Sequence, residues 1–222
     1  MNLSALNHGL GRFAASLAFS ALAFQAGAAG LEDDIDRIQR EWAVIQYKVP
    51  EAQRVDRFTS LAQQAHAVTQ ANPQRAQAHV WEGIVLSSLA GAKGGLGALG
   101  IVKQAKAEYE AAIQIDPNTL SGSALNSLAV LYYKVPGWPV GFGDNAKAEQ
   151  LFKQALAVNP DGIDPNYFYA DYLVYRERYA DAMPYLEKSL KAPPRAGREV
   201  ADAGRREEAR ALLEKVKAKL GG

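Results

Sequence analysis

The hydrophobic positions of this chain repeat one pattern four times. Each copy has three small or apolar positions spaced four and three residues apart, and a proline follows five residues later. Such spacings place side chains on one face of an α-helix, and the proline ends the helix because it cannot donate the next backbone hydrogen bond. The pattern therefore predicts four helices with buried ladders: Leu61, Ala65, Val68, Pro73; Ala105, Tyr109, Ala112, Pro117; Ala148, Phe152, Ala155, Pro160; and Ala182, Leu186, Ser189, Pro194.

The distances between the prolines give the length of the repeat. Pro160 and Pro194 are 34 residues apart, whereas Pro73 to Pro117 spans 44 residues and Pro117 to Pro160 spans 43. A 34-residue unit with this ladder resembles the tetratricopeptide repeat (TPR), a pair of antiparallel helices that stacks on its neighbours. The resemblance covers about residues 31–194. It implies an all-α, TPR-like helical-hairpin solenoid of about four repeats, with two inter-helix loop insertions.

Both ends of the repeat region also show helical periodicity. An apolar stripe predicts the first helix of the first pair, with Leu31, Ile35, Ile38, Trp42 and Ile45 on one face. After Pro194 we expect a C-terminal capping helix from Glu199 to Leu220, whose apolar face carries Val200, Ala203, Leu212, Leu213, Val216 and Leu220.

The first 28 residues have the pattern of a secretory signal peptide. Arg12 precedes the apolar run of residues 13–24, and the small residues Ala26 and Ala28 follow it. This run is shorter than the about 20 residues that a bilayer core requires, and small residues at this spacing are typical of a cleavage site. The predicted organisation is a signal peptide at 1–28, cleaved near Ala28, and a TPR-like domain at 29–222.

The charge and the composition of the chain exclude several classes of function. Removal of residues 1–28 takes away one basic residue, Arg12, and leaves equal numbers of basic and acidic residues. A chain with balanced, interleaved charges has no electrostatic footprint for nucleic acid or for an anionic membrane, and no further apolar run predicts membrane insertion after signal cleavage. The absence of cysteine excludes disulfides and thiol chemistry and, in a secreted protein, fits a bacterial periplasm.

The residues that commonly carry catalysis do not form a recognisable motif. His66 and His79 lie on different predicted helices, and neither has a neighbouring motif typical of a metal site or a catalytic triad. We therefore expect a protein that is not an enzyme, with no catalytic residues, no metal and no cofactor.

The two insertions carry the most unusual composition. Residues 91–100 contain five glycines with Leu96 and Leu99 between them. They lack the G-x4-G-K-[ST] pattern and a preceding strand, so the composition favours a flexible or apolar lid over a phosphate-binding loop. Residues 134–144 combine glycines and prolines with Trp138 and Phe142, and they end at Asp144, which is a good N-cap for the next helix.

Two interpretations of these insertions remain open. They fall at the same place in successive pairs, so we expect them to be neighbours. In the first interpretation they close an apolar site over the concave surface, whose candidate residues are Trp138, Phe142, Tyr132, Leu128, Val80, Ile84, Tyr167 and Asp171. In the second they cover an exposed end of the core, to which each buried aromatic would contribute about 3 kcal/mol.

The insertions also carry a second resemblance. With the signal peptide and the absence of cysteine, the segments KGGLGALG and YYKVPGWPVGFGDNAKAEQLF resemble the T component associated with tripartite ATP-independent periplasmic (TRAP) transporters. That resemblance implies a periplasmic binding module that associates with a solute-binding protein and encloses an apolar pore for a small ligand. The alternative function is a structural scaffold for cell-envelope protein complexes.

Overall fold

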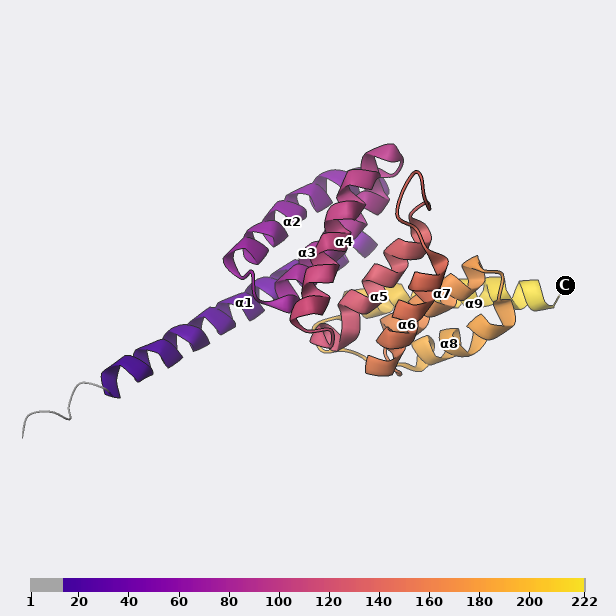
Figure 1. The fold of residues 1–222 in the computed structure, drawn as a ribbon. Helices are drawn as coiled ribbons and strands as arrows, with labels where there is room; N and C mark the ends of the chain where they lie inside the picture. The colour runs from indigo at the N-terminus through magenta and orange to yellow at the C-terminus, as the bar shows by residue number, and fades with distance from the viewer. Residues whose placement is uncertain (1–13, 222) are drawn as a thin grey trace, which may run out of the picture.

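The structure is a computed structural model that describes residues 14–221, with side chains described from Gly30 onwards. Within this part of the chain the secondary structure is helical, without strands (Figure 1). The α-helices are α1 (Ala14–Lys48), α2 (Glu51–Ala71), α3 (Ala76–Lys93), α4 (Leu99–Ile115), α5 (Thr119–Lys134), α6 (Asn145–Val158), α7 (Ile163–Tyr175), α8 (Tyr179–Lys191) and α9 (Glu199–Leu220).

The helices pack as successive pairs. α1 packs on α2, α3 on α4, α5 on α6 and α7 on α8, and each pair also contacts the next one (Figure 1). α9 follows the fourth pair as a single terminal helix. The prediction of an all-α, TPR-like solenoid with four repeats and a C-terminal helix is confirmed.

The predicted ladders form the contacts within and between these pairs. All twelve ladder positions are buried, including the polar Ser189, whose hydroxyl donates to the carbonyl of Ile163 at 2.9 Å. In the second pair a large residue packs against a small one, because the ring of Tyr109 on α4 lies against the backbone of Gly83 on α3. A Cβ atom at Gly83 would lie 2.5 Å from Cε1 of Tyr109, so this close approach requires glycine.

The insertion of the second pair is helical over much of its length. α3 continues to Lys93 and α4 begins at Leu99, so the expected loop over 91–100 shrinks to a turn at Gly94 and Gly95, followed by the short 3-10 helix η1 (Leu96–Ala98). Both turn glycines have positive φ angles, 63° and 61°, which glycine adopts readily. The extra residues lengthen α3 and α4 to 18 and 17 residues, whereas α7 and α8 have 13 each.

The insertion of the third pair is a true loop. The N–H group of Gly143 donates to the carbonyl of Pro136 at 2.9 Å, and that of Asp144 donates to the carbonyl of Tyr132 at 2.8 Å, which closes the loop at its base. The Asp144 carboxylate then accepts from the N–H groups of Ala146 and Lys147 at 2.9 and 3.0 Å. This confirms Asp144 as the N-cap of α6.

The N-terminal helix differs from the expected start near Leu31. α1 is continuous from Ala14 to Lys48 and passes through Ala28, the predicted cleavage position. Residues 1–13 lie outside the described residues, so the signal peptide stays a prediction. Among the helices that the structure describes, none combines the length and apolar character of a membrane span.

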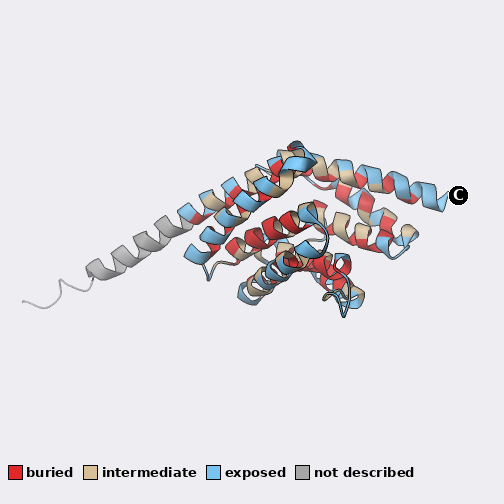
Figure 2. Cartoon of the chain, turned by 90° about the horizontal axis from the view of Figure 1, so that it is seen from above, coloured by how far each residue is buried: buried red, intermediate tan, exposed pale blue. Residues whose placement is uncertain are grey.

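The last helix packs against the first. α9 contacts α1, α7 and α8, and Figure 2 shows α1 and α9 along one side of the molecule, with α9 running to the end marked C. The ring of Tyr47 lies so close to Gly204 that a Cβ atom there would be 2.3 Å from Cδ1 of the ring. Of the apolar face expected for α9, Leu213 and Val216 are buried, whereas Ala203 is exposed.

Candidate ligand-binding site

Two adjacent cavities lie between the first helices of the pairs and α1. The smaller cavity has a volume of about 390 Å³ and is bounded by residues 195–198, which connect α8 to α9; we call it the linker cavity. The larger cavity has a volume of about 650 Å³ and reaches both insertions; we call it the loop cavity. The two cavities share walls formed by Trp42, Ser87, Ser88, Val130, Leu131, Phe168 and Arg205.

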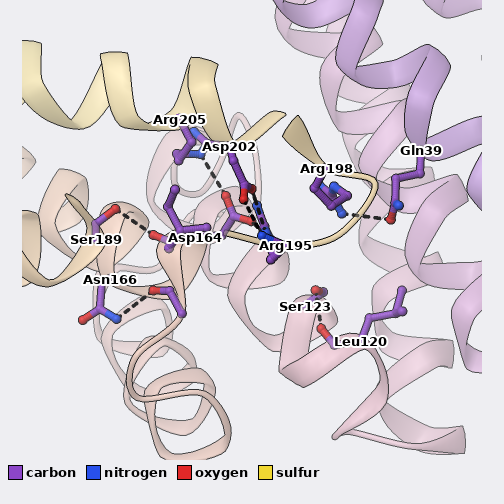
Figure 3. Close-up of polar contacts among 12 residues, drawn as sticks. Gln39, Leu120, Ser123, Asp164, Asn166, Ser189, Arg195, Arg198, Asp202 and Arg205 are labelled. Atoms are coloured by element: carbon purple, nitrogen blue, oxygen red, sulfur yellow. Dashed lines mark hydrogen bonds and ion pairs between the residues drawn. The ribbon is translucent and has the colours of Figure 1, made fainter. Parts of the chain in front are cut away.

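Ion pairs fix the linker that bounds the linker cavity. The guanidinium of Arg195 donates to the Asp202 carboxylate at 2.6 and 2.8 Å and to the Asp164 carboxylate at 2.7 Å (Figure 3). The backbone N–H of Arg195 also donates to Asp202 at 2.9 Å. Because Asp164 belongs to α7 and Asp202 to α9, Arg195 ties the linker to two helices.

A second arginine completes the same network. Nε of Arg205 donates to Asp164 at 2.9 Å and its Nη1 donates to Glu208 at 2.6 Å. The guanidinium carbon lies 4.6 and 4.2 Å from the ring centroids of Tyr167 and Phe168, a stacking arrangement. Burial alone would raise the pKa of the Asp164 carboxyl, but the two arginines outweigh it and hold that pKa well below its usual range.

A third arginine, Arg198, has no carboxylate partner among the described residues. Its Nη1 donates to the side-chain carbonyl of Gln39 at 2.9 Å (Figure 3), and its guanidinium carbon lies 5.3 Å from the ring centroid of Trp81. Its Nε has no hydrogen-bond partner. Burial, together with the nearby charge of Arg195, lowers the pKa of Arg198.

Two further residues that line the linker cavity each hold one buried polar atom without a hydrogen-bond partner. These atoms are Nε1 of Trp81, a residue 2% exposed, and Oδ1 of Asn126, a residue 5% exposed. Buried polar groups are nearly always hydrogen-bonded in proteins, and one that is not costs about 1–3 kcal/mol. Together with Nε of Arg198, these atoms are buried and unsatisfied polar groups in three residues that line the cavity.

The backbone at the start of α5 is strained where it lines the same cavity. Leu120, Ser121 and Gly122 have φ angles of 48°, 56° and 74°, and only the glycine adopts this region without steric cost. The hydroxyl of Ser123 donates to the carbonyl of Leu120 at 2.6 Å and supports this turn (Figure 3). Strained backbone of this kind often accompanies binding sites.

The chemistry that this arrangement offers is binding. Trp42, Ile84 and Phe168 provide apolar walls, and polar side chains of the lining can donate or accept hydrogen bonds. Within residues 30–221, no three His, Asp or Glu side chains gather in a way that would hold a metal ion.

The candidate residues predicted from sequence occupy three kinds of position. Ile84 lines the linker cavity and Tyr167 lines the loop cavity. Val80, Leu128 and Tyr132 are buried in the core and line neither. Asp171 accepts a hydrogen bond from the hydroxyl of Tyr133 and forms an ion pair with Lys134 at 2.9 Å. Their roles in binding stay predictions.

The two aromatic residues of the third-pair insertion lie in different environments. Phe142 packs edge-on against Tyr132, with ring centroids 5.7 Å apart, whereas Trp138 is 90% exposed. The insertions themselves are neighbours as expected, because residues 91–99 and 134–136 both contribute to the loop cavity.

Sequence reasoning missed several of the residues that line the linker cavity. Arg198, Trp81 and Asn126 come from the α8–α9 linker, α3 and α5, and no local motif joins them. The signal available was the group of three arginines at 195, 198 and 205 after two prolines, in a chain of otherwise balanced charge.

Comparison with known proteins adds little to these observations. No protein-family model matches the sequence, and no curated protein matches it. A solved structure from a functional characterisation of Pseudomonas aeruginosa PilF is 15% identical, with alignment over 86% of this chain and 92% of that chain and a TM-score of 0.34. A likeness of this size assigns neither ligand nor partner. The stacked helix pairs themselves define the class of the protein, a TPR-like α-solenoid.

Proposed function

We propose that this protein is a non-catalytic binding module that holds a small ligand in the linker cavity. The observation that carries the proposal is that this cavity combines apolar walls with polar side chains from α1, α3, α5 and the α8–α9 linker. Its volume of about 390 Å³ lies within the range of small-molecule sites.

A cavity-filling variant tests this function. Ile84→Phe places a larger side chain in the linker cavity, whereas Val44→Phe, on an exposed position of α1, is a matched control. Each protein is incubated with a fractionated small-molecule extract and analysed by native mass spectrometry. We expect wild type and Val44→Phe to retain a bound small molecule and Ile84→Phe to lose it. Equal retention by all three proteins would show that the ligand binds elsewhere, and no bound molecule in any would oppose the proposal.

We further propose that the module works in the periplasm as an accessory component of a TRAP-type transport system, with a solute-binding protein as partner. The resemblance of the two insertion segments to the TRAP T component and the predicted signal peptide support this role. Affinity purification of the tagged protein after cross-linking in cells, with identification by mass spectrometry, tests it. We expect enrichment of a solute-binding protein over an unrelated exported control, and recovery of none would argue against the transport role.

A scaffold for cell-envelope protein complexes is the second candidate, and one observation favours it. Leu96, Trp138 and Val140 are 79%, 90% and 52% exposed on the neighbouring insertions, where apolar side chains offer a protein contact. If scaffolding is the function, Trp138→Ala should release the cross-linked partner while ligand capture persists. Retention of the partner by Trp138→Ala would remove this support.

A further inference from the structure

We infer that the edge of the molecule formed by the two insertions binds the surface of an anionic lipid membrane. The edge comprises residues 91–107 and 134–148, and we call it the insertion edge. Figure 1 shows the turn between α3 and α4 beside the loop between α5 and α6, and residues of both segments line the loop cavity. The inference is independent of the ligand proposed for the linker cavity.

Apolar side chains lie at the tips of the insertion edge. Leu96 belongs to the turn between α3 and α4, and Trp138 and Val140 belong to the loop between α5 and α6. Among the large apolar residues that the structure describes, Trp138 and Leu96 are the two most exposed. Exposed apolar side chains that gather in this way mark a contact with a protein or with a membrane.

The insertion edge carries an excess of positive charge, although the charges of the whole chain nearly balance. It contains one acidic residue, Asp144, and five lysines: Lys93, Lys103, Lys106, Lys134 and Lys147. Glu110 pairs with Lys106 at 2.6 Å. Asp171 pairs with Lys134 at 2.9 Å. The remaining three lysines leave a positive surface, which attracts an anionic partner.

The order of side chains along each insertion favours a lipid surface as that partner. Lys93 is the last residue of α3 and precedes Leu96 by three positions. Lys134 is the last residue of α5 and precedes Trp138 by four positions. Both insertions therefore place an apolar side chain at the tip and a lysine at the helix end behind it. Tryptophan is enriched where a membrane meets water, and lysines near the surface are attracted to anionic lipids.

The residues around the tips also fit a lipid surface better than a protein. The tips, residues 94–98 and 136–143, consist mainly of glycine, alanine and proline apart from their few large apolar side chains. Such residues offer little side-chain surface for the close complementary packing of a stable protein interface. A lipid surface requires no such complementarity, since binding scales with the apolar area buried and with the charge attraction.

Vesicles of two compositions test this contact: phosphatidylcholine alone, and phosphatidylcholine mixed with phosphatidylglycerol. The protein is purified after export, and its binding is measured by co-flotation. Trp42 and Trp81 are buried within the protein, so a shift of emission to shorter wavelength reports on Trp138. We expect binding and an emission shift with the mixed vesicles. Both should be weak with phosphatidylcholine alone and should fall at high salt, because salt screens exposed charges.

Charge variants locate the contact. Lys93→Gln combined with Lys103→Gln should weaken binding to mixed vesicles by at least about tenfold, because each basic residue near an anionic surface strengthens binding about fivefold. Lys215→Gln combined with Lys219→Gln makes the same charge change at exposed positions of α9 and should bind like wild type. All four positions are exposed, so the unfolding temperature should stay unchanged.

A second pair of variants tests the apolar tips. Leu96→Ser combined with Trp138→Ser should weaken co-flotation with mixed vesicles by at least about tenfold, because two large apolar side chains no longer leave water. Val44→Ser combined with Tyr175→Ser removes two exposed apolar side chains elsewhere and should bind like wild type.

The outcomes separate this inference from the other proposals. If wild type binds neither vesicle, if it binds without a shift of emission, or if the variants at the insertion edge bind like their controls, the inference is wrong. Release of a cross-linked protein by Trp138→Ala in a chain that ignores vesicles would assign the edge to the scaffold function instead. Capture of a small molecule in the linker cavity, tested with Ile84→Phe, stands or fails independently of these results.

Discussion

Replacement of Asp164 by asparagine should destabilise the protein by about 3 kcal/mol at neutral pH. The carboxylate accepts charge-assisted hydrogen bonds from Arg195 at 2.7 Å and from Arg205 at 2.9 Å. Each such bond contributes about 1.5–3 kcal/mol, and asparagine keeps one neutral acceptor oxygen. The Arg205 side chain, 9% exposed, would remain with Glu208 as its only carboxylate.

The pH dependence provides a stricter check of the same reasoning. The pKa of Asp164 is lowered in the folded state, so its contribution is present in full above the unfolded value of about 4 and is lost as pH falls below it. The stability difference between wild type and Asp164→Asn should therefore be largest at pH 7 and should shrink by pH 3. Urea unfolding followed by circular dichroism at both pH values measures it.

Asp181→Asn is the matched control. Asp181 pairs with Arg178 at 2.8 Å, but their side chains are 55% and 43% exposed, so its loss should change stability by less than about 1 kcal/mol. If Asp164→Asn costs no more than Asp181→Asn at pH 7, the ion-pair network does not hold the linker. If the difference from wild type is the same at pH 3 and pH 7, its origin is not the charge of Asp164.

Three further predictions concern packing and processing. Gly83→Ala should destabilise the protein by about 1–3 kcal/mol, because the added methyl group meets the buried ring of Tyr109. Gly91→Ala lies in open space on the same helix and should be neutral or stabilising by up to about 1 kcal/mol; thermal unfolding measures both variants. Phe142→Ala should lower the unfolding temperature and Trp138→Ala should not, since only Phe142 packs on the core; equal effects would contradict this assignment. Intact-mass measurement of the exported protein should show a mature chain that begins near Ala29, and a full-length mass would refute cleavage.

The sequence predicted the repeat well because the repeat rests on local spacing. Ala105, Tyr109 and Ala112 needed only helical periodicity to be identified as buried, and all three are. The extent of the insertion in the second pair was misjudged because five glycines suggested a loop, whereas α3 and α4 extend into residues 91–100 at a cost of about 1 kcal/mol per glycine.

The site was harder to predict because it is built from polar residues in buried places. The buried face of α9 includes Asp202 and Arg205, so a search for apolar spacing placed Ala203 on that face in error. The partners of these two residues, Arg195 and Asp164, lie on the linker and on α7. Ion pairs between separate elements depend on how the helices stack, and hydrophobic spacing carries no information about them.

The contact between α1 and α9 changes how this solenoid folds. In an open repeat array, each unit depends on its immediate neighbours, so folding can start anywhere and the ends can fray. Here the hydrogen bonds of Tyr47 with Glu208 and of Arg198 with Gln39 join residues 161 and 159 positions apart. Such distant contacts form only after the intervening chain has been ordered. A ligand bound in the linker cavity would therefore recognise only a completed chain, and its binding energy would stabilise the whole stack against unfolding from either end.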